Sequence, residues 1–157
     1  MFKKIFFVVV LFALAFTAPV SAAWTERISG GMSYSSIGEF TVTLSAWENS
    51  DGSYGGQGQY YYPGNGNTFH LEVEKICTGT ANSGQPYVIA IGPVKLQDGT
   101  VFEKEYGAIA VVEGGEAADR VRVKLYSSFE TADAFCTGGD PGASVQVLDG
   151  NFNIRGK

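Results

Sequence analysis

The stretch Phe40-Thr41-Val42-Thr43-Leu44-Ser45-Ala46-Trp47 decides the fold class. Apolar and polar side chains alternate along it, and β-branched residues recur. Because successive side chains of a strand point to opposite faces of a sheet, this period of two predicts a half-buried β-strand. Trp47 falls on the side of the threonines and the serine, which is the polar side of that strand.

The same period of two recurs along the rest of the chain. Residues 69–74 and 120–125 alternate between apolar and polar side chains, whereas residues 87–91 and 108–112 are apolar almost throughout, as in strands buried on both faces. The sequence therefore predicts one all-β domain, an antiparallel β-sandwich or barrel-like sheet of roughly eight to ten strands. Any helix is expected to be a single turn within residues 130–135.

Glycine-rich segments punctuate these strands and predict the turns between them. They are Gly30-Gly31, Asp51-Gly52, Gly55-Gly56, Pro63-Gly64-Asn65-Gly66, Gly114-Gly115 and Gly138-Gly139-Asp140-Pro141-Gly142. In residues 69–76 strict alternation would turn Ile76 outward, so we expect a bulge or a strand end near Glu74-Lys75.

Asp149-Gly150 predicts a two-residue β-hairpin turn near the end of the chain, because this pair tolerates the positive φ angles of a type I′ turn. Such a turn would place Val147 opposite Phe152 and Val145 opposite Ile154, so that apolar residues meet on one face.

The first residues have the three parts of a secretory signal peptide. Two lysines, Lys3 and Lys4, precede an apolar run over residues 5–16, and Val20-Ser21-Ala22 supplies small residues for cleavage. The run is shorter than the roughly 20 apolar residues of a membrane-spanning helix and is followed by Pro19. We therefore expect residues 1–22 to be a signal peptide and residues 23–157 to be the exported domain, periplasmic or extracellular, with no transmembrane segment.

The charge of the exported domain argues against two classes of partner. The whole chain has a formal net charge of −5, and removal of Lys3 and Lys4 with the leader makes it −7. Nucleic-acid binding depends on clustered lysine and arginine, so no nucleic acid is expected. Anionic lipid surfaces should repel the domain for the same reason.

Cys77 and Cys136 are the two cysteines of the chain. In an oxidising compartment such a pair usually forms a disulfide, and we predict one here. Closing a loop of about 60 residues would stabilise the fold by roughly 4 kcal/mol. The alternative is a reactive thiol, which would need a nearby base, and His70 is the single histidine.

A series of turn and strand features runs through most of the exported domain. They are Gly58-Gln59-Tyr60, Phe69-His70-Leu71 leading to Cys77, Val88-Ile89-Ala90-Ile91-Gly92, Val112-Glu113-Gly114-Gly115-Glu116, Asp119-Arg120-Val121 and Gly150-Asn151-Phe152-Asn153-Ile154-Arg155. Their order resembles a group of small exported bacterial β-domain proteins of uncharacterised function. Ala117-Ala118 stands where that group has Pro-Gly. The resemblance implies an all-β exported domain and no particular activity.

Catalytic and metal chemistry find little support in the sequence. His70 has no nucleophile motif beside it, so a structural histidine is the favoured interpretation and no catalytic residue is predicted. One histidine and two bridged cysteines leave too few ligands for zinc, and no cofactor is expected. Calcium would need loop oxygens, and the candidate ligands, with solvated turn carboxylates as the alternative, are Glu48, Asp51, Glu113, Glu116 and Asp119.

Aromatic side chains are the stronger functional lead. Tyr60-Tyr61-Tyr62 lies beside a Pro-Gly turn, and Tyr61 must point away from its two neighbours if the segment is a strand. Together with Trp47 these rings form a candidate surface for a glycan or a protein partner. Rings that cover the second face of the sheet are the alternative.

These observations favour an exported, non-catalytic binding or surface-associated module. Two alternatives remain open. One is a secreted hydrolase with carboxylates brought together across strands. The other is a structural or assembly protein that pairs through exposed β-edges.

Overall fold

The computed structural model describes residues 24–35, 39–62, 66–97, 101–114, 119–142, 145–146 and 149–155. The strands in them are β1 (Trp24–Ser35), β2 (Glu39–Asn49), β3 (Tyr54–Tyr62), β4 (Asn67–Glu72), β5 (Lys75–Thr80), β6 (Pro86–Leu96), β7 (Val101–Val112), β8 (Arg120–Tyr126), β9 (Val145–Gln146) and β10 (Asp149–Arg155), and the helix is α1 (Phe129–Thr137). The predicted all-β fold is confirmed.

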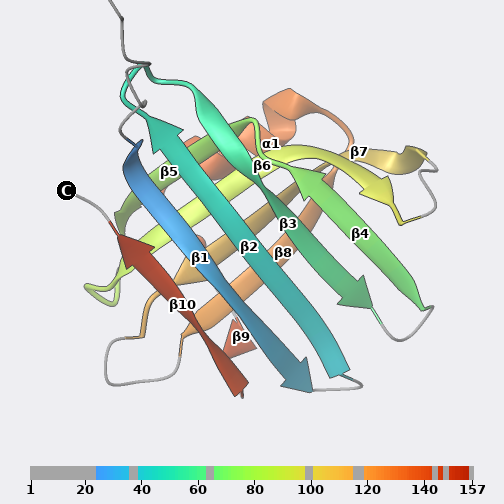
Figure 1. Ribbon diagram of the computed structural model, residues 1–157, viewed down its shortest axis with the longest axis horizontal. Helices are drawn as coiled ribbons and strands as arrows, with labels where there is room; N and C mark the ends of the chain where they lie inside the picture. Colours follow the sequence, from blue (N-terminus) through green and yellow to red (C-terminus); the bar gives the residue numbers. More distant parts are fainter. Residues whose placement is uncertain are drawn as a thin grey trace, which may run out of the picture.

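The strands form one antiparallel ladder that is bent into two layers (Figure 1). Its order is β10-β1-β2-β3-β4-β6-β7-β8-β9, and β5 pairs with β6. We call β10, β1, β2, β3 and β4 the front layer and β5, β6, β7, β8 and β9 the back layer. The strands of the two layers cross steeply in Figure 1. Within the described residues the sheet does not close, so the fold is sandwich-like.

The bend between the layers occurs where β4 gives way to β5. Both strands pair with β6, with Leu71 opposite Val94 and Lys75 opposite Ile91. Between them the Glu74 N–H donates to the carbonyl of Ile91 at 2.9 Å. A side chain at Gly92 would overlap the Glu72 carbonyl oxygen, so glycine is required for this close approach. The predicted strand end near Glu74-Lys75 is confirmed.

The main core lies between the two layers and comes from the inward side chains of both. Its buried residues are Val42, Leu44, Ala46, Phe69, Leu71, Val73, Ile76, Val88, Ala90, Val94, Ile109, Val111, Val121 and Phe152. Removing this apolar surface from water is the main driving force for the sandwich. The alternation predicted for residues 40–47 and 69–73 is therefore confirmed.

A second apolar cluster fills the space between the back layer and α1. It consists of Ala81, Tyr87, Ile89, Ile91, Ala108, Ala110, Val112, Ala132 and Cys136. β6 contributes to both clusters, which confirms that this strand is buried on both faces. The back layer is thus covered on one side by the front layer and on the other by the helix.

The helix is longer than the single turn expected for it. Ser128 is its N-cap, with a side-chain oxygen that accepts the N–H of Thr131, and the helix extends over nine residues. Ala132 and Cys136, four residues apart, form its buried side. Cys136 is bonded to Cys77 on β5, so the predicted disulfide is confirmed. None of the helical structure in the described part of the chain has the length and apolar character of a membrane-spanning helix.

The hairpin predicted at Asp149-Gly150 is wrong. These two residues lie inside β10, opposite Ser33 and Met32 of β1. Val145 pairs with Val121 of β8, and Ile154 pairs with Ile28 of β1; Val147 lies outside the described residues. β9 and β10 therefore join opposite ends of the ladder rather than each other. Gly30-Gly31 and Gly55-Gly56, predicted as turns, lie inside β1 and β3.

Candidate functional site

The side of the front layer that faces away from the core carries polar side chains. On β2, Thr41 and Thr43 are exposed and Ser45 is half-buried, whereas the intervening apolar residues are buried. We call this side the outward face. The strand register extends it across β3 and β4, because Thr43 lies opposite Gln59 and Gln59 lies opposite His70. Hydroxyl and amide groups thus predominate on it.

Trp47 lies at one end of the outward face and is half-buried. It pairs with Gly55 of β3, and a Cβ added to Gly55 would come within 2.9 Å of the indole Cε2 atom. The indole therefore rests on the bare backbone of Gly55, which holds the ring on the polar side predicted for it.

The three consecutive tyrosines do not form one surface. Tyr60 turns inward and stacks between Phe40 at 5.8 Å and Phe69 at 6.1 Å, measured between ring centroids. Tyr61 is 37% exposed and is the exposed large hydrophobic residue among those described. The side chain of Tyr62 lies outside the described part. Of this predicted aromatic surface, the structure places Trp47 and Tyr61 on the outward face and assigns Tyr60 to core packing.

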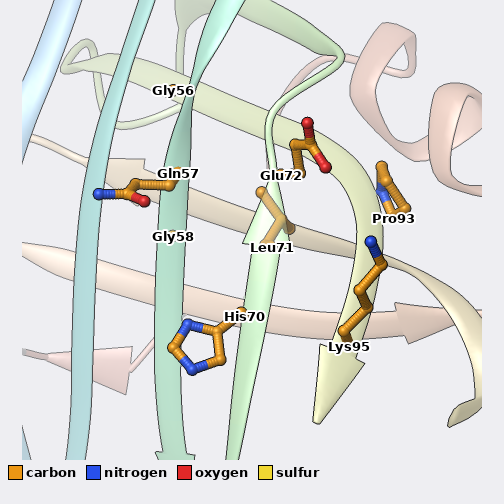
Figure 2. Close-up of a pocket in the computed structure, with 8 residues that line it drawn as sticks. All are labelled: Gly56, Gln57, Gly58, His70, Leu71, Glu72, Pro93 and Lys95. Atoms are coloured by element: carbon orange, nitrogen blue, oxygen red, sulfur yellow. The ribbon is translucent and has the colours of Figure 1, made fainter. Parts of the chain in front are cut away.

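A hollow of about 310 Å³ lies beside the outward face where β3, β4 and β6 meet (Figure 2). It is lined by Gly56, Gln57, Gly58, His70, Leu71, Glu72, Pro93 and Lys95. In Figure 2 the side chains of Glu72 and Lys95 extend towards Pro93, whereas the His70 ring lies nearer β3. None of the four polar side chains makes a hydrogen bond or ion pair with another described residue.

The lining of the hollow suits binding better than hydrolysis. Among the described residues that line it there is no serine, threonine, cysteine or tyrosine nucleophile for His70 to activate. Glu72 is the single carboxylate among these residues, whereas glycoside hydrolysis ordinarily needs two. The imidazole, carboxylate, ammonium and amide groups around the hollow can all form hydrogen bonds with a polar ligand.

The candidate calcium ligands between β2 and β3 belong to a turn. The Asp51 carboxylate accepts hydrogen bonds from the hydroxyl of Ser53 at 2.6 Å and from its N–H at 2.9 Å. These bonds, that of the hydroxyl first, hold the pKa of Asp51 below its usual value. Glu48 is half-buried on β2. The turn chemistry alone accounts for the Asp51 carboxylate.

The second group of candidate ligands contains a buried structural carboxylate. Asp119 is 6% exposed, and its two oxygens accept the N–H of Gly114 at 2.9 Å and the N–H of Phe152 at 2.7 Å. Glu113 is half-buried, and Glu116 lies outside the described residues. Across the described ranges, no three His, Cys, Asp or Glu side chains gather into a metal-binding group. Asp119 instead joins the end of β7 to β10.

Asp140 is a further structural carboxylate that sequence reasoning missed, its only signal being a short acidic residue in a Gly-Pro loop. Its oxygens accept the N–H groups of Asn82 and Gly142, both at 2.8 Å. These bonds, that of Asn82 first, lower the pKa of Asp140. They connect the turn after β5 to the loop after α1.

Asp140→Asn should therefore destabilise the protein at neutral pH and matter less in acid. A folded-state pKa below the unfolded value adds stability above pH about 4, and this stability is lost as the pH falls through the folded-state pKa. Urea unfolding of both proteins at pH 7 and pH 3 should show the difference shrinking at the lower pH. Glu105→Gln, which removes an exposed carboxylate with no hydrogen bond to a described residue, is the control. A difference that grows in acid would contradict the assignment.

The chain matches no protein-family model, and searches of curated proteins and of solved structures find no match for it. The resemblance to small exported bacterial β-domain proteins thus stays a prediction. The outward face and the adjoining hollow are the features from which a function can be inferred.

Proposed function

We propose that this protein is an exported, non-catalytic module that binds carbohydrate through the outward face of the front layer. The observation that carries the proposal is the unequal covering of the two layers. α1 packs on the outer side of the back layer, whereas no described element packs on the outward face. That face presents hydroxyl and amide groups together with the rings of Trp47 and Tyr61.

The composition of the outward face favours a sugar over a protein partner. Hydroxyl and amide side chains both donate and accept hydrogen bonds, as sugar hydroxyls do. Trp47 lies opposite Gly55, and Gly55 precedes Tyr61 by six residues on β3. The rings of Trp47 and Tyr61 are therefore separated by about 20 Å along the strand direction. A protein interface would have an apolar centre, and on the outward face Tyr61 is the large apolar side chain that is exposed.

Two observations support export. The Cys77–Cys136 disulfide is typical of proteins that work in an oxidising compartment. The first 22 residues have the pattern of a cleavable leader, with two lysines, an apolar run and small residues before the expected cleavage point. Both fit a module that meets its ligand outside the cytoplasm.

Trp47→Ala and Tyr61→Ala test the proposal. Residues 23–157 are applied to a glycan array, and hits are measured by isothermal titration calorimetry. Because a ring contact contributes about 1 kcal/mol beyond area burial, we expect each variant to bind several-fold to tenfold more weakly and the double variant to lose binding.

Phe135→Ala is the matched control, because it removes a half-buried ring from α1 on the far side of the back layer. Its affinity should equal that of the unaltered protein. Circular dichroism shows whether each variant is folded. If no glycan on the array binds at high protein concentration, or if folded Trp47 and Tyr61 variants bind normally, carbohydrate binding through this face is refuted.

A further inference from the structure

We infer that the hollow lined by His70, Glu72 and Lys95 is a subsite for one neutral, polyhydroxylated sugar ring. This inference rests on the proposed function and specifies its ligand class. It assigns a role to residues that are separate from the aromatic surface, on β4 and β6 as well as β3.

The size of the hollow fits one ring. Small-ligand sites usually have volumes of about 300 to 1,000 Å³, and this hollow, at about 310 Å³, is at the lower limit. It lies at the bend of the ladder, where β4 pairs with β6 only as far as Leu71. Gly56 cannot carry a side chain, because a Cβ there would lie 2.6 Å from the Ala46 Cα atom. The space is therefore a consequence of the backbone arrangement.

The polar groups around the hollow are free to bind a ligand. Gln57, His70, Glu72 and Lys95 make no hydrogen bond or ion pair with other described residues. In contrast, Asp119 uses both of its oxygens within the fold. The exposed side chains in the hollow hold neither the strands nor the loops together, so the fold does not require their polar groups.

The balance of charge selects a neutral ligand. The formal charges of Glu72 and Lys95 cancel, and both side chains extend towards the same end of the hollow (Figure 2). An anionic sugar would gain from Lys95 but would be repelled by Glu72 and by the formal charge of −7 predicted for the exported domain. A hydroxyl group can accept from the ammonium group and donate to the carboxylate at the same time.

The hollow also continues the outward face. Gln57 lies opposite Glu72 and is two residues from Gly55, against which Trp47 rests. Two residues of strand correspond to about 7 Å. A glycan whose one ring stacks on Trp47 can therefore place a neighbouring ring in the hollow.

His70 provides a direct probe of the hollow because it is the single histidine of the chain. Protein prepared without a histidine tag has one set of imidazole proton signals in its NMR spectrum. We would titrate it with hexasaccharides of α-1,4-glucose, β-1,4-glucose and β-1,4-N-acetylglucosamine, and with hexagalacturonate as the acidic probe. We expect at least one neutral hexasaccharide to shift the His70 signals and hexagalacturonate to leave them unchanged.

Glu72→Gln and Lys95→Gln should each weaken binding of that hexasaccharide about tenfold, as expected when one charge-assisted hydrogen bond is lost. Glu113→Gln and Arg120→Gln make the same changes in charge at the far ends of β7 and β8, and their affinities should stay within twofold of the unaltered protein.

Three results would overturn the inference. If only hexagalacturonate shifts the His70 signals, the subsite is acidic-sugar specific. If a neutral hexasaccharide needs Trp47 but leaves His70 unshifted, and the Glu72 and Lys95 variants bind normally, the hollow is not a subsite, although the proposed function stands. If none of the array glycans and none of the four hexasaccharides binds, both are wrong.

Discussion

Asp119→Ala should lower the free energy of unfolding by about 3 to 5 kcal/mol, because it leaves two buried N–H groups without an acceptor. The Asp119 carboxylate accepts the N–H of Gly114 and that of Phe152, a residue that is 1% exposed. Loss of the carboxylate removes two charge-assisted hydrogen bonds and disconnects the end of β7 from β10. It leaves a small cavity in which both N–H groups lack a partner. Urea unfolding of the purified domain at pH 7 measures the loss.

Two companion variants separate this effect from a simple loss of charge. Asp119→Asn keeps one oxygen acceptor, so its free energy of unfolding should lie between that of the alanine variant and that of the unaltered protein. Asp51→Ala also removes a hydrogen-bonded carboxylate, but from an exposed turn, and should lower the free energy of unfolding far less than Asp119→Ala does. Equal losses at Asp119 and Asp51 would contradict the structural role assigned to Asp119.

Removing the disulfide should have an effect of similar size. Cys77 and Cys136 are 59 residues apart, and the chain-entropy model gives about 4 kcal/mol for a loop of this length. We expect Cys77→Ala/Cys136→Ala to unfold at a correspondingly lower urea concentration. α1 should be affected first, because the disulfide is its covalent link to β5, where the ion pair between Lys75 and Asp133 also holds it.

The reduced protein is the control for the disulfide, because it keeps both sulfur atoms. If cross-linking is the cause, reduction of the unaltered protein should reproduce most of the loss, while the alanine variant should not respond to reductant. Mass measurement after alkylation reports the state of the thiols. A loss below about 1 kcal/mol on reduction would show that the bond contributes little beyond packing.

The elements that the sequence predicts well are those whose burial follows a local pattern. Residues 40–47 alternate because one face of β2 covers the core, and residues 87–91 are apolar because β6 is covered twice. For α1 the sequence predicts too short a helix, because the buried side of this helix consists of Ala132 and Cys136 alone. Its length depends on the Ser128 cap and on packing against the back layer, neither of which appears as helical periodicity.

The incorrect hairpin shows where local turn chemistry fails. Asp149-Gly150 is favourable for a two-residue turn, but pairing with β1 offers β10 a ladder of seven residues. The alternation of apolar residues in β1 is interrupted by Glu26 and Gly30, so it does not identify this strand as the partner of β10. The outcome is therefore decided by a contact between distant parts of the sequence.

The candidate site likewise has one part that the sequence predicts and one part that it does not. Strand parity placed Trp47 on the polar side and separated Tyr61 from its neighbours, as the structure shows. The hollow was not predicted, because it brings His70 and Glu72 next to Lys95, more than twenty residues further along the chain. The pairing of β4 with β6 depends on the bend after β4, and this pairing cannot be predicted from composition or from the spacing of residues.

The pairing of β1 with β10 also determines when the front layer is complete. Arg27 lies opposite Arg155, so the second edge of β1 stays open until β10 has been made. Contacts of such long sequence separation form slowly, because the intervening chain must be ordered first. The outward face, in contrast, lies on β2, β3 and β4, which pair with their neighbours in the sequence. We therefore expect the face proposed to meet the ligand to form before β10 covers the edge of β1.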